Sequence, residues 1–138
     1  MNVEVKLDVS AKDFWKIIVD SIIQDMGEEA EIYAGLTFEK KLPTTLSGFM
    51  TAKVEIVEYV EEKCYAADFI TSRSTVHSAY RITEEEQGIL VSYEEEETFE
   101  NKMDQWNAKL MKSLYKKSRT KKLIYKLKSI EKHIKGEV

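Results

Sequence analysis

The sequence predicts a single α+β domain in which an antiparallel sheet is closed by a long C-terminal helix. Its 138 residues fit one domain and can bury a real core. Helical periodicity occurs near both ends of the chain, whereas the segment from Leu36 to Phe99 has a period of two. The separators inside that segment are short and polar, which forces neighbouring strands to run antiparallel. No linker or repeat divides the chain, so we expect one domain over residues 1–138.

The N-terminal segment predicts a strand followed by a helix. Val3, Val5, Leu7 and Val9 alternate with polar residues, as in a strand with one buried face. Ser10 is a suitable helix cap, and Gly27 supplies a left-handed stop. Between them, apolar residues follow at helical spacing: Phe14, Trp15, Ile18, Ile22 and Met26. The segment up to Gly35 is expected to add one or two helical turns, with Ile32 and Tyr33 buried.

Five further strands are expected, forming a meander with the first strand at one edge. They are Leu36–Leu42, Phe49–Val60, Cys64–Thr71, Thr75–Thr83 and Ile89–Phe99. Alternation predicts an inner face made of Phe38, Val54, Ile56, Tyr65, Phe69, Val76, Tyr80, Ile82, Val91 and Tyr93. The outer face is mostly charged and includes Glu39, Glu55, Asp68, His77 and Arg81. The inner face therefore needs a cover.

The segment from Asn101 to Gly136 is the longest helical pattern in the chain and has two apolar stripes. Asn101 caps it, with Asp104 three residues later as in a capping box. The first stripe, led by Trp106, is Met103, Trp106, Leu110 and Leu114, and we expect it to cover the sheet.

The second stripe is Leu123, Leu127, Ile130 and Ile134, and it is out of phase with the first. Leu127 falls about 220° round the helix from Leu114 at about 100° per residue. The helix must therefore bend, or its tail must bury against something else. One hypothesis is that this second stripe docks on a second copy or on another protein.

The net charge of −4 conceals a strong imbalance. Residues 101–138 hold twelve Lys or Arg against three acidic residues, and residues 1–100 hold nine against twenty-two. The basic helix either neutralises its own acidic sheet or meets an anionic partner. The sequence argues against nucleic acid as a partner, because the whole chain is acidic and has no recognised binding motif.

The sequence favours a cytoplasmic protein without a transmembrane segment. It has no run of about 18 apolar residues, and its N-terminus alternates where a signal peptide would have an apolar block. The single Cys64 is expected to be a buried structural thiol. His77 and His133 are expected at the surface, and no catalytic, phosphate-binding or metal motif is present. We expect no metal and no cofactor, and prefer a non-enzymatic function.

The strand and capped helix ending VSAKDFWKIIVD, the last strand GILVSYEEEETFE and the long C-terminal helix together resemble the helix-grip superfamily. This superfamily contains START-related lipid-binding domains and birch-pollen-allergen-like proteins, and the resemblance is to a small bacterial branch known only as a domain of unknown function. It implies a curved antiparallel sheet of six or seven strands wrapped around the C-terminal helix. Seven strands are usual there and six are counted here, so either LSGFM contains an extra bend or the sheet is abbreviated.

The resemblance also implies a cavity between sheet and helix. The candidate lining residues are Trp15, Phe38, Tyr65, Phe69, Tyr80, Tyr93, Glu95, Trp106 and Leu110. The leading hypothesis is that this space binds a small hydrophobic or amphipathic molecule. The alternatives are that these side chains fill the core, that the second helix stripe mediates association such as a homodimer, or that the protein is a cyclase-like or hydrolase-like enzyme.

In the enzyme hypothesis, Glu95 or a cavity tyrosine carries the chemistry. Glu95 and Glu97 would point inward near the end of the sheet, where burial could raise a carboxyl pKa and make it a base. Alternatively, they pair with lysines of the covering helix, such as Lys102 or Lys109.

Overall fold

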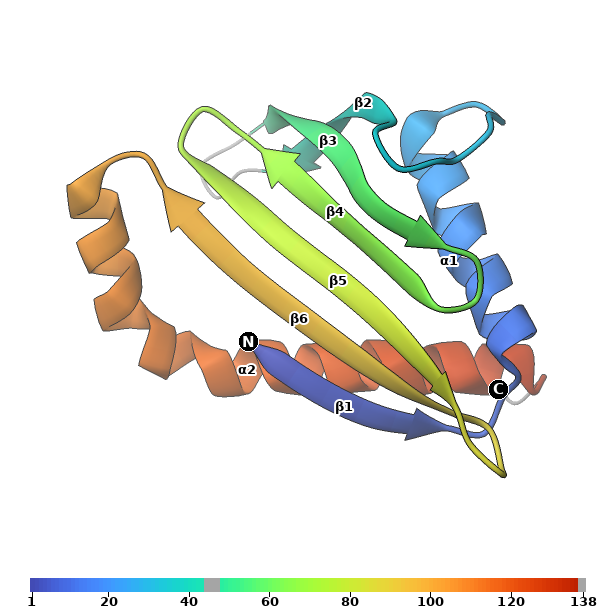
Figure 1. Ribbon diagram of the computed structural model, residues 1–138. Helices are drawn as coiled ribbons and strands as arrows, with labels where there is room; N and C mark the ends of the chain where they lie inside the picture. The colour runs from blue at the N-terminus through green and yellow to red at the C-terminus, as the bar shows by residue number, and fades with distance from the viewer. Residues whose placement is uncertain (44–47, 137–138) are drawn as a thin grey trace.

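The structure of the protein is a computed structural model that describes residues 1–43 and 48–136, without the side chains of residue 108 and residues 110–117. The described chain forms six strands and two helices (Figure 1). Their bounds are β1 Asn2–Leu7, α1 Ala11–Met26, β2 Thr37–Pro43, β3 Phe49–Val60, β4 Cys64–Ile70, β5 Ser74–Glu84, β6 Ile89–Phe99 and α2 Lys102–Ile134. The strands form one antiparallel sheet in the order β1-β6-β5-β4-β3-β2. The predicted meander with the first strand at an edge is therefore confirmed.

Helix α1 begins and ends where its capping residues predict. The Ser10 side chain accepts a hydrogen bond from the Asp13 N–H at 3.1 Å. Gly27 has a φ of 79°, and its N–H donates to the carbonyl of Ile23 at 3.0 Å. The buried face of the helix carries Phe14, Trp15, Ile18 and Ile22, as the sequence predicts.

The helical turns expected between Glu28 and Gly35 are absent, and this prediction is wrong. The segment has no regular secondary structure; Ile32 is partly buried, but Tyr33 is 52% exposed. The reason lies in the backbone, because Gly35 N–H donates to the Ile56 carbonyl at 2.7 Å. Ile56 N–H donates in turn to the carbonyl of Leu36 at 2.9 Å, so the chain approaches β2 extended along β3.

The core lies between one face of the sheet and the two helices. Tyr65, Tyr80, Tyr93 and Val3 form one row across β4, β5, β6 and β1, with side chains on the inner face. Val54, Ile56 and Val91 on the same face are fully buried, as predicted from the alternation of the strands. This face packs against the apolar side of α1 and against Leu123 and Leu127 of α2.

The part of α2 that covers the sheet is the opposite of the one predicted. Met103 and Trp106, at the start of the helix, are 71% and 64% exposed. Leu127, in the second half, is completely buried. Figure 1 shows that the first part of α2, coloured orange, projects from the end of β6 and that the red part then turns to run beside β1. The prediction that the first stripe covers the sheet is therefore wrong for Met103 and Trp106, and the side chains of Leu110 and Leu114 lie outside the described residues.

Polar contacts hold the second half of α2 against β1. Lys128 Nζ donates to the Lys6 carbonyl at 2.9 Å. The Asp8 N–H donates to a carboxylate oxygen of Glu131 at 2.6 Å, and Lys135 Nζ lies 3.0 Å from the Asp8 carboxylate. These contacts join segments more than 120 residues apart and add to the apolar packing of the tail.

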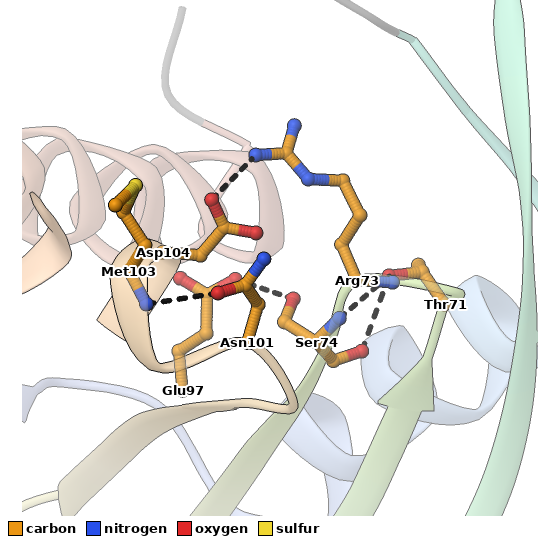
Figure 2. Close-up of polar contacts among 7 residues, drawn as sticks. All are labelled: Thr71, Arg73, Ser74, Glu97, Asn101, Met103 and Asp104. Atoms are coloured by element: carbon orange, nitrogen blue, oxygen red, sulfur yellow. Dashed lines mark hydrogen bonds and ion pairs between the residues drawn. The ribbon is translucent and has the colours of Figure 1, made fainter. Parts of the chain in front are cut away.

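The beginning of α2 is tied to the turn between β4 and β5. The Asn101 side chain accepts a hydrogen bond from the Met103 N–H at 2.9 Å, which caps the helix. Asp104 lies 3.5 Å from the guanidinium of Arg73. Figure 2 shows these contacts with those of the neighbouring turn, which join Thr71, Ser74 and Glu97. These contacts therefore hold the start of α2 against the β4–β5 turn.

The single cysteine, Cys64, is buried, as predicted, and burial raises the pKa of its thiol. None of the helices, over the residues that are described, combines the length and the apolar character needed to cross a membrane.

Candidate ligand cavity

A partly open cavity of about 300 Å³ lies between the inner face of the sheet, α1 and the second half of α2. Apolar and aromatic side chains from all three layers line it. Those of α1 include Phe14, Ile18 and Ile22, those of the sheet Phe69, Val76 and Tyr80, and those of α2 Leu127 and Ile130. The volume is at the lower end of the range of small-molecule sites, which is roughly 300–1,000 Å³. The rings of the inner face therefore border a pocket that opens to solvent.

Five of the nine residues proposed for the cavity from the sequence line it. They are Tyr65, Phe69, Tyr80, Tyr93 and Glu95. All five lie on β4, β5 or β6 and point to the face that alternation identified.

The other four proposed residues do not line this cavity in the described structure. Trp15 is buried in the core, where its ring lies 5.3 Å from that of Tyr59. Phe38 is partly buried against the same core. Trp106 is on the projecting part of α2, and the side chain of Leu110 lies outside the described residues.

The stripe proposed for association belongs to the core of the single chain. Leu123 and Leu127 are buried, and Ile130 and Ile134 are partly buried against the same cluster. Leu127 and Ile130 also line the cavity. The prediction that this stripe is a free docking surface is therefore wrong, because the second half of α2 packs on its own sheet and on α1.

Several cavity residues were not identified from the sequence. Ile17, Ser21 and Asp25 lie on α1 next to its apolar stripe, Lys40 lies on β2, and Lys126 lies on α2. The three residues of α1 could have been predicted from their spacing, because residues 14, 17, 18, 21, 22 and 25 share one side of a helix. The position of that side relative to the tail of α2 could not be read from spacing.

At one end of the cavity, Lys40 is held by two contacts. Its Nζ lies 3.0 Å from Asp25 Oδ2 and 5.8 Å from the centroid of the Phe69 ring. Both side chains of the ion pair are about 30% exposed. The pair joins α1 to β2, and the two charges neutralise each other at the cavity wall.

At another point on the cavity wall, Glu95 is bound by two protein donors. Its Oε1 accepts a hydrogen bond from the Tyr93 hydroxyl at 2.7 Å, and its Oε2 accepts one from Arg119. Glu97 accepts a hydrogen bond from Ser74 at 2.7 Å. The expectation that Lys102 or Lys109 pairs with these carboxylates is wrong, because the helix approaches β6 at Arg119 rather than along its first turns.

Burial raises the pKa values of the three cavity tyrosines. The pKa of Tyr93 is raised to about 12 by burial and by Tyr80, against a lowering by Arg119. Burial is also the main cause of the raised pKa of Tyr65 and the cause of that of Tyr80. The rings of Tyr80 and Tyr93 lie 4.7 Å apart at 52°. All three hydroxyls therefore remain protonated at neutral pH.

These shifts predict a loss of stability at alkaline pH. The folded protein holds the three protons more tightly than the unfolded chain, whose tyrosines titrate near pH 10. The contribution of Tyr93 to the free energy of unfolding is fully present below about pH 10 and is lost as the pH rises through about 12. We expect urea unfolding to show this decline, and Tyr93→Phe to make it shallower. An identical decline in the variant would contradict the assignment to Tyr93.

In the part of the chain that the structure describes, both helices lie on the inner side of the sheet, and the opposite face carries the predicted charged residues (Figure 1). His77 Nδ1 lies 2.6 Å from Asp68 Oδ1, with the His77 side chain 45% exposed. Both histidines are exposed, as predicted. Over the residues that the structure describes, no group of three or more His, Cys, Asp or Glu side chains is arranged to hold a metal ion.

Comparisons with known proteins identify a family and a fold. Residues 1–116 match the family described as a domain of unknown function, DUF3284. No curated protein matches the chain.

Three solved structures illustrate the likeness of fold. A protein from Nitrosomonas europaea superposes with a TM-score of 0.64 at 10% identity, covering 99% of this chain and 94% of its own. A protein of unknown function from Staphylococcus aureus has a TM-score of 0.64 at 12% identity, covering 97% and 91%. The di-domain ARO/CYC protein StfQ from the steffimycin biosynthetic pathway has a TM-score of 0.56 at 10% identity, covering 72% of this chain and 37% of its own. At such identities the likeness is one of fold alone.

Proposed function

The chain belongs to the DUF3284 family, a domain of unknown function, and we propose that it binds a small hydrophobic or amphipathic molecule in the cavity between its sheet and its two helices. The observation that carries this proposal is the partly open space of about 300 Å³ between the sheet and the two helices. Its lining combines aliphatic and aromatic groups with a few polar ones, and such a lining binds the apolar part of a ligand while orienting its polar end.

We also propose that the domain is a member of the START-related helix-grip superfamily. The element order, with a strand and a helix before the meander and a long helix after it, supports this assignment. The likeness of fold to StfQ, which its name describes as an ARO/CYC protein of a biosynthetic pathway, supports it as well. In this chain the described sheet has six strands, and the second half of the last helix is the part that covers it.

Binding without catalysis is the version that the geometry favours. A general base needs a carboxylate oxygen that can reach the ligand proton. Both oxygens of Glu95 already accept hydrogen bonds, one from Tyr93 and one from Arg119, and these donors stabilise the charged carboxylate and so weaken it as a base. Glu95 is therefore better placed to hold α2 against β6 than to remove a proton.

The test is binding of 1-octanol by the wild-type protein and by two tryptophan variants of α1. Ser21 is exposed and lines the cavity, whereas Asp20 is exposed on the same helix and does not line it. We expect 1-octanol to shift the amide resonances of cavity residues in a two-dimensional NMR titration. Ser21→Trp should weaken binding at least about tenfold by occupying the mouth, since a large ring replaces a ligand-sized volume, and Asp20→Trp should change it less than about twofold.

Native mass spectrometry of the protein purified without denaturation supplies a second readout. A reproducible additional mass that is released on unfolding would identify the chemical class of the bound molecule. Absence of resonance shifts with 1-octanol, or equal binding by both variants, would overturn the proposed site.

A further inference from the structure

We propose that the cavity selects amphipathic molecules with a negatively charged head group, such as a carboxylate, and that Lys126 with the hydroxyls of Tyr65 and Tyr80 recognises this group. The inference rests on the proposed function, because it names the class of ligand for the same cavity. Some polar groups of the lining are already bound by the protein, and others are not.

Among the charged side chains that line the cavity, one cation has no counter-ion in the part of the chain that the structure describes. Four charged residues line the cavity, namely Asp25, Lys40, Glu95 and Lys126. Asp25 and Lys40 bind each other, and Glu95 is bound by Arg119. Among the residues that the structure describes, Lys126 has no ion-pair partner. With their partners included, the charges at the cavity wall therefore sum to a positive value.

The uncharged polar groups of the lining also include hydrogen-bond donors that the protein leaves unused. The Tyr93 hydroxyl donates to Glu95, and the Ser78 hydroxyl donates to the Ala67 carbonyl at 3.4 Å. The hydroxyls of Tyr65 and Tyr80 make no hydrogen bond to any part of the chain that the structure describes. Because burial raises the pKa of both, each keeps a proton that it can donate to a ligand.

A positively charged head group finds no such partner. Both cavity carboxylates already bind a protein cation, Lys40 at Asp25 and Arg119 at Glu95, which weakens their attraction for an ammonium ligand. An anionic head group meets unused donors at Lys126, Tyr65 and Tyr80, and the carboxylate that acts on Tyr65, Asp25, is neutralised by Lys40. Hydrogen bonds between charged and neutral partners are stronger than those between two neutral groups.

The size of the cavity limits the apolar part. At roughly 30 Å³ for each water-sized group, about 300 Å³ holds on the order of ten such groups. An eight-carbon chain with one head group matches that size. The matched probes are therefore octanoate, 1-octanol and octylammonium, which differ in charge and hardly in volume.

The experiment measures the affinities of the three probes at pH 7 and low salt by calorimetry. We expect octanoate to bind about tenfold more tightly than 1-octanol, and octylammonium to bind more weakly than either, in line with a charge-assisted contact. Raising the salt concentration should weaken octanoate binding and leave 1-octanol binding unchanged. Equal affinities for octanoate and 1-octanol would overturn the anionic preference and leave the proposed function intact. Absence of binding by all three would overturn both.

Two sets of variants assign the preference to residues. Lys126→Met should reduce octanoate affinity by about three- to tenfold more than it changes 1-octanol affinity, because it removes the charge and retains an apolar chain. Lys121→Met is the matched control, since Lys121 is an exposed lysine of the same helix that does not line the cavity. Tyr65→Phe with Tyr80→Phe should also weaken octanoate binding. An equal effect of Lys121→Met and Lys126→Met would show only a general attraction to the basic helix and would overturn the assignment.

Discussion

Leu127→Ala is expected to lower the free energy of unfolding by about 2–5 kcal/mol, the range for removing a buried leucine side chain. Leu127 is completely buried in the core between α1, α2 and the sheet. Trp106→Ala removes a larger side chain, yet should change stability by less than about 0.5 kcal/mol, because Trp106 is 64% exposed. Urea unfolding followed by far-ultraviolet circular dichroism measures both values without depending on tryptophan fluorescence.

This pair of variants distinguishes the two possible paths of the last helix. Tyr125→Ala is the control within the second half, since Tyr125 is 76% exposed only two residues from Leu127. A large loss for Trp106→Ala with a small loss for Leu127→Ala would mean that the first stripe covers the sheet, as its spacing predicts. The cavity described above would then have to be abandoned, because α2 supplies one of its walls.

Gly88→Ala is expected to destabilise the domain by at least about 4 kcal/mol, which only a few kinds of mutation reach. Gly88 has a φ of 85° in the turn between β5 and β6, and a Cβ there would lie 2.1 Å from the carbonyl oxygen of Leu7. The obstructing atom belongs to the backbone of β1, which is paired with β6 at this point. Relief would therefore require β1 to move away from the sheet.

Gly27→Ala separates the steric effect from the backbone conformation. Gly27 has a similar φ of 79°, but a Cβ there would have nothing within 4 Å. Its replacement should cost only the penalty of a left-handed conformation, about 1–2 kcal/mol. Thermal or urea unfolding of the two variants checks the difference. Equal losses would contradict the close approach of β1 to the β5–β6 turn.

Much of the local structure could be predicted because it depends on neighbouring residues. Ser10 and Gly27 mark the ends of α1 through capping geometry that is complete within a few residues. Strands β3 and β6 begin and end at the predicted residues, since alternation and polar turns define them. The face of the sheet on which Tyr65, Tyr80 and Tyr93 lie followed from the same period of two.

The candidate site could be predicted only in part. The sheet residues of the cavity were found because they share the buried face, whereas Lys40 and Lys126 were not found. Aromatic residues on a predicted inner face indicate a possible binding site, whereas a lysine in a strand or in a basic helix is usually a solvated surface residue. Only their position beside an unfilled volume distinguishes them.

The sequence by itself determined the order of the elements, the antiparallel meander, the inner face of the sheet and the existence of two apolar stripes out of phase on the last helix. The tertiary structure decided which stripe is buried, which carboxylate Arg119 binds and where a cavity remains. These features depend on contacts between residues far apart in the chain, such as Lys128 with Lys6 and Glu131 with Asp8. Periodicity shows that a helix has an apolar face, but only the packing of distant segments determines what that face meets.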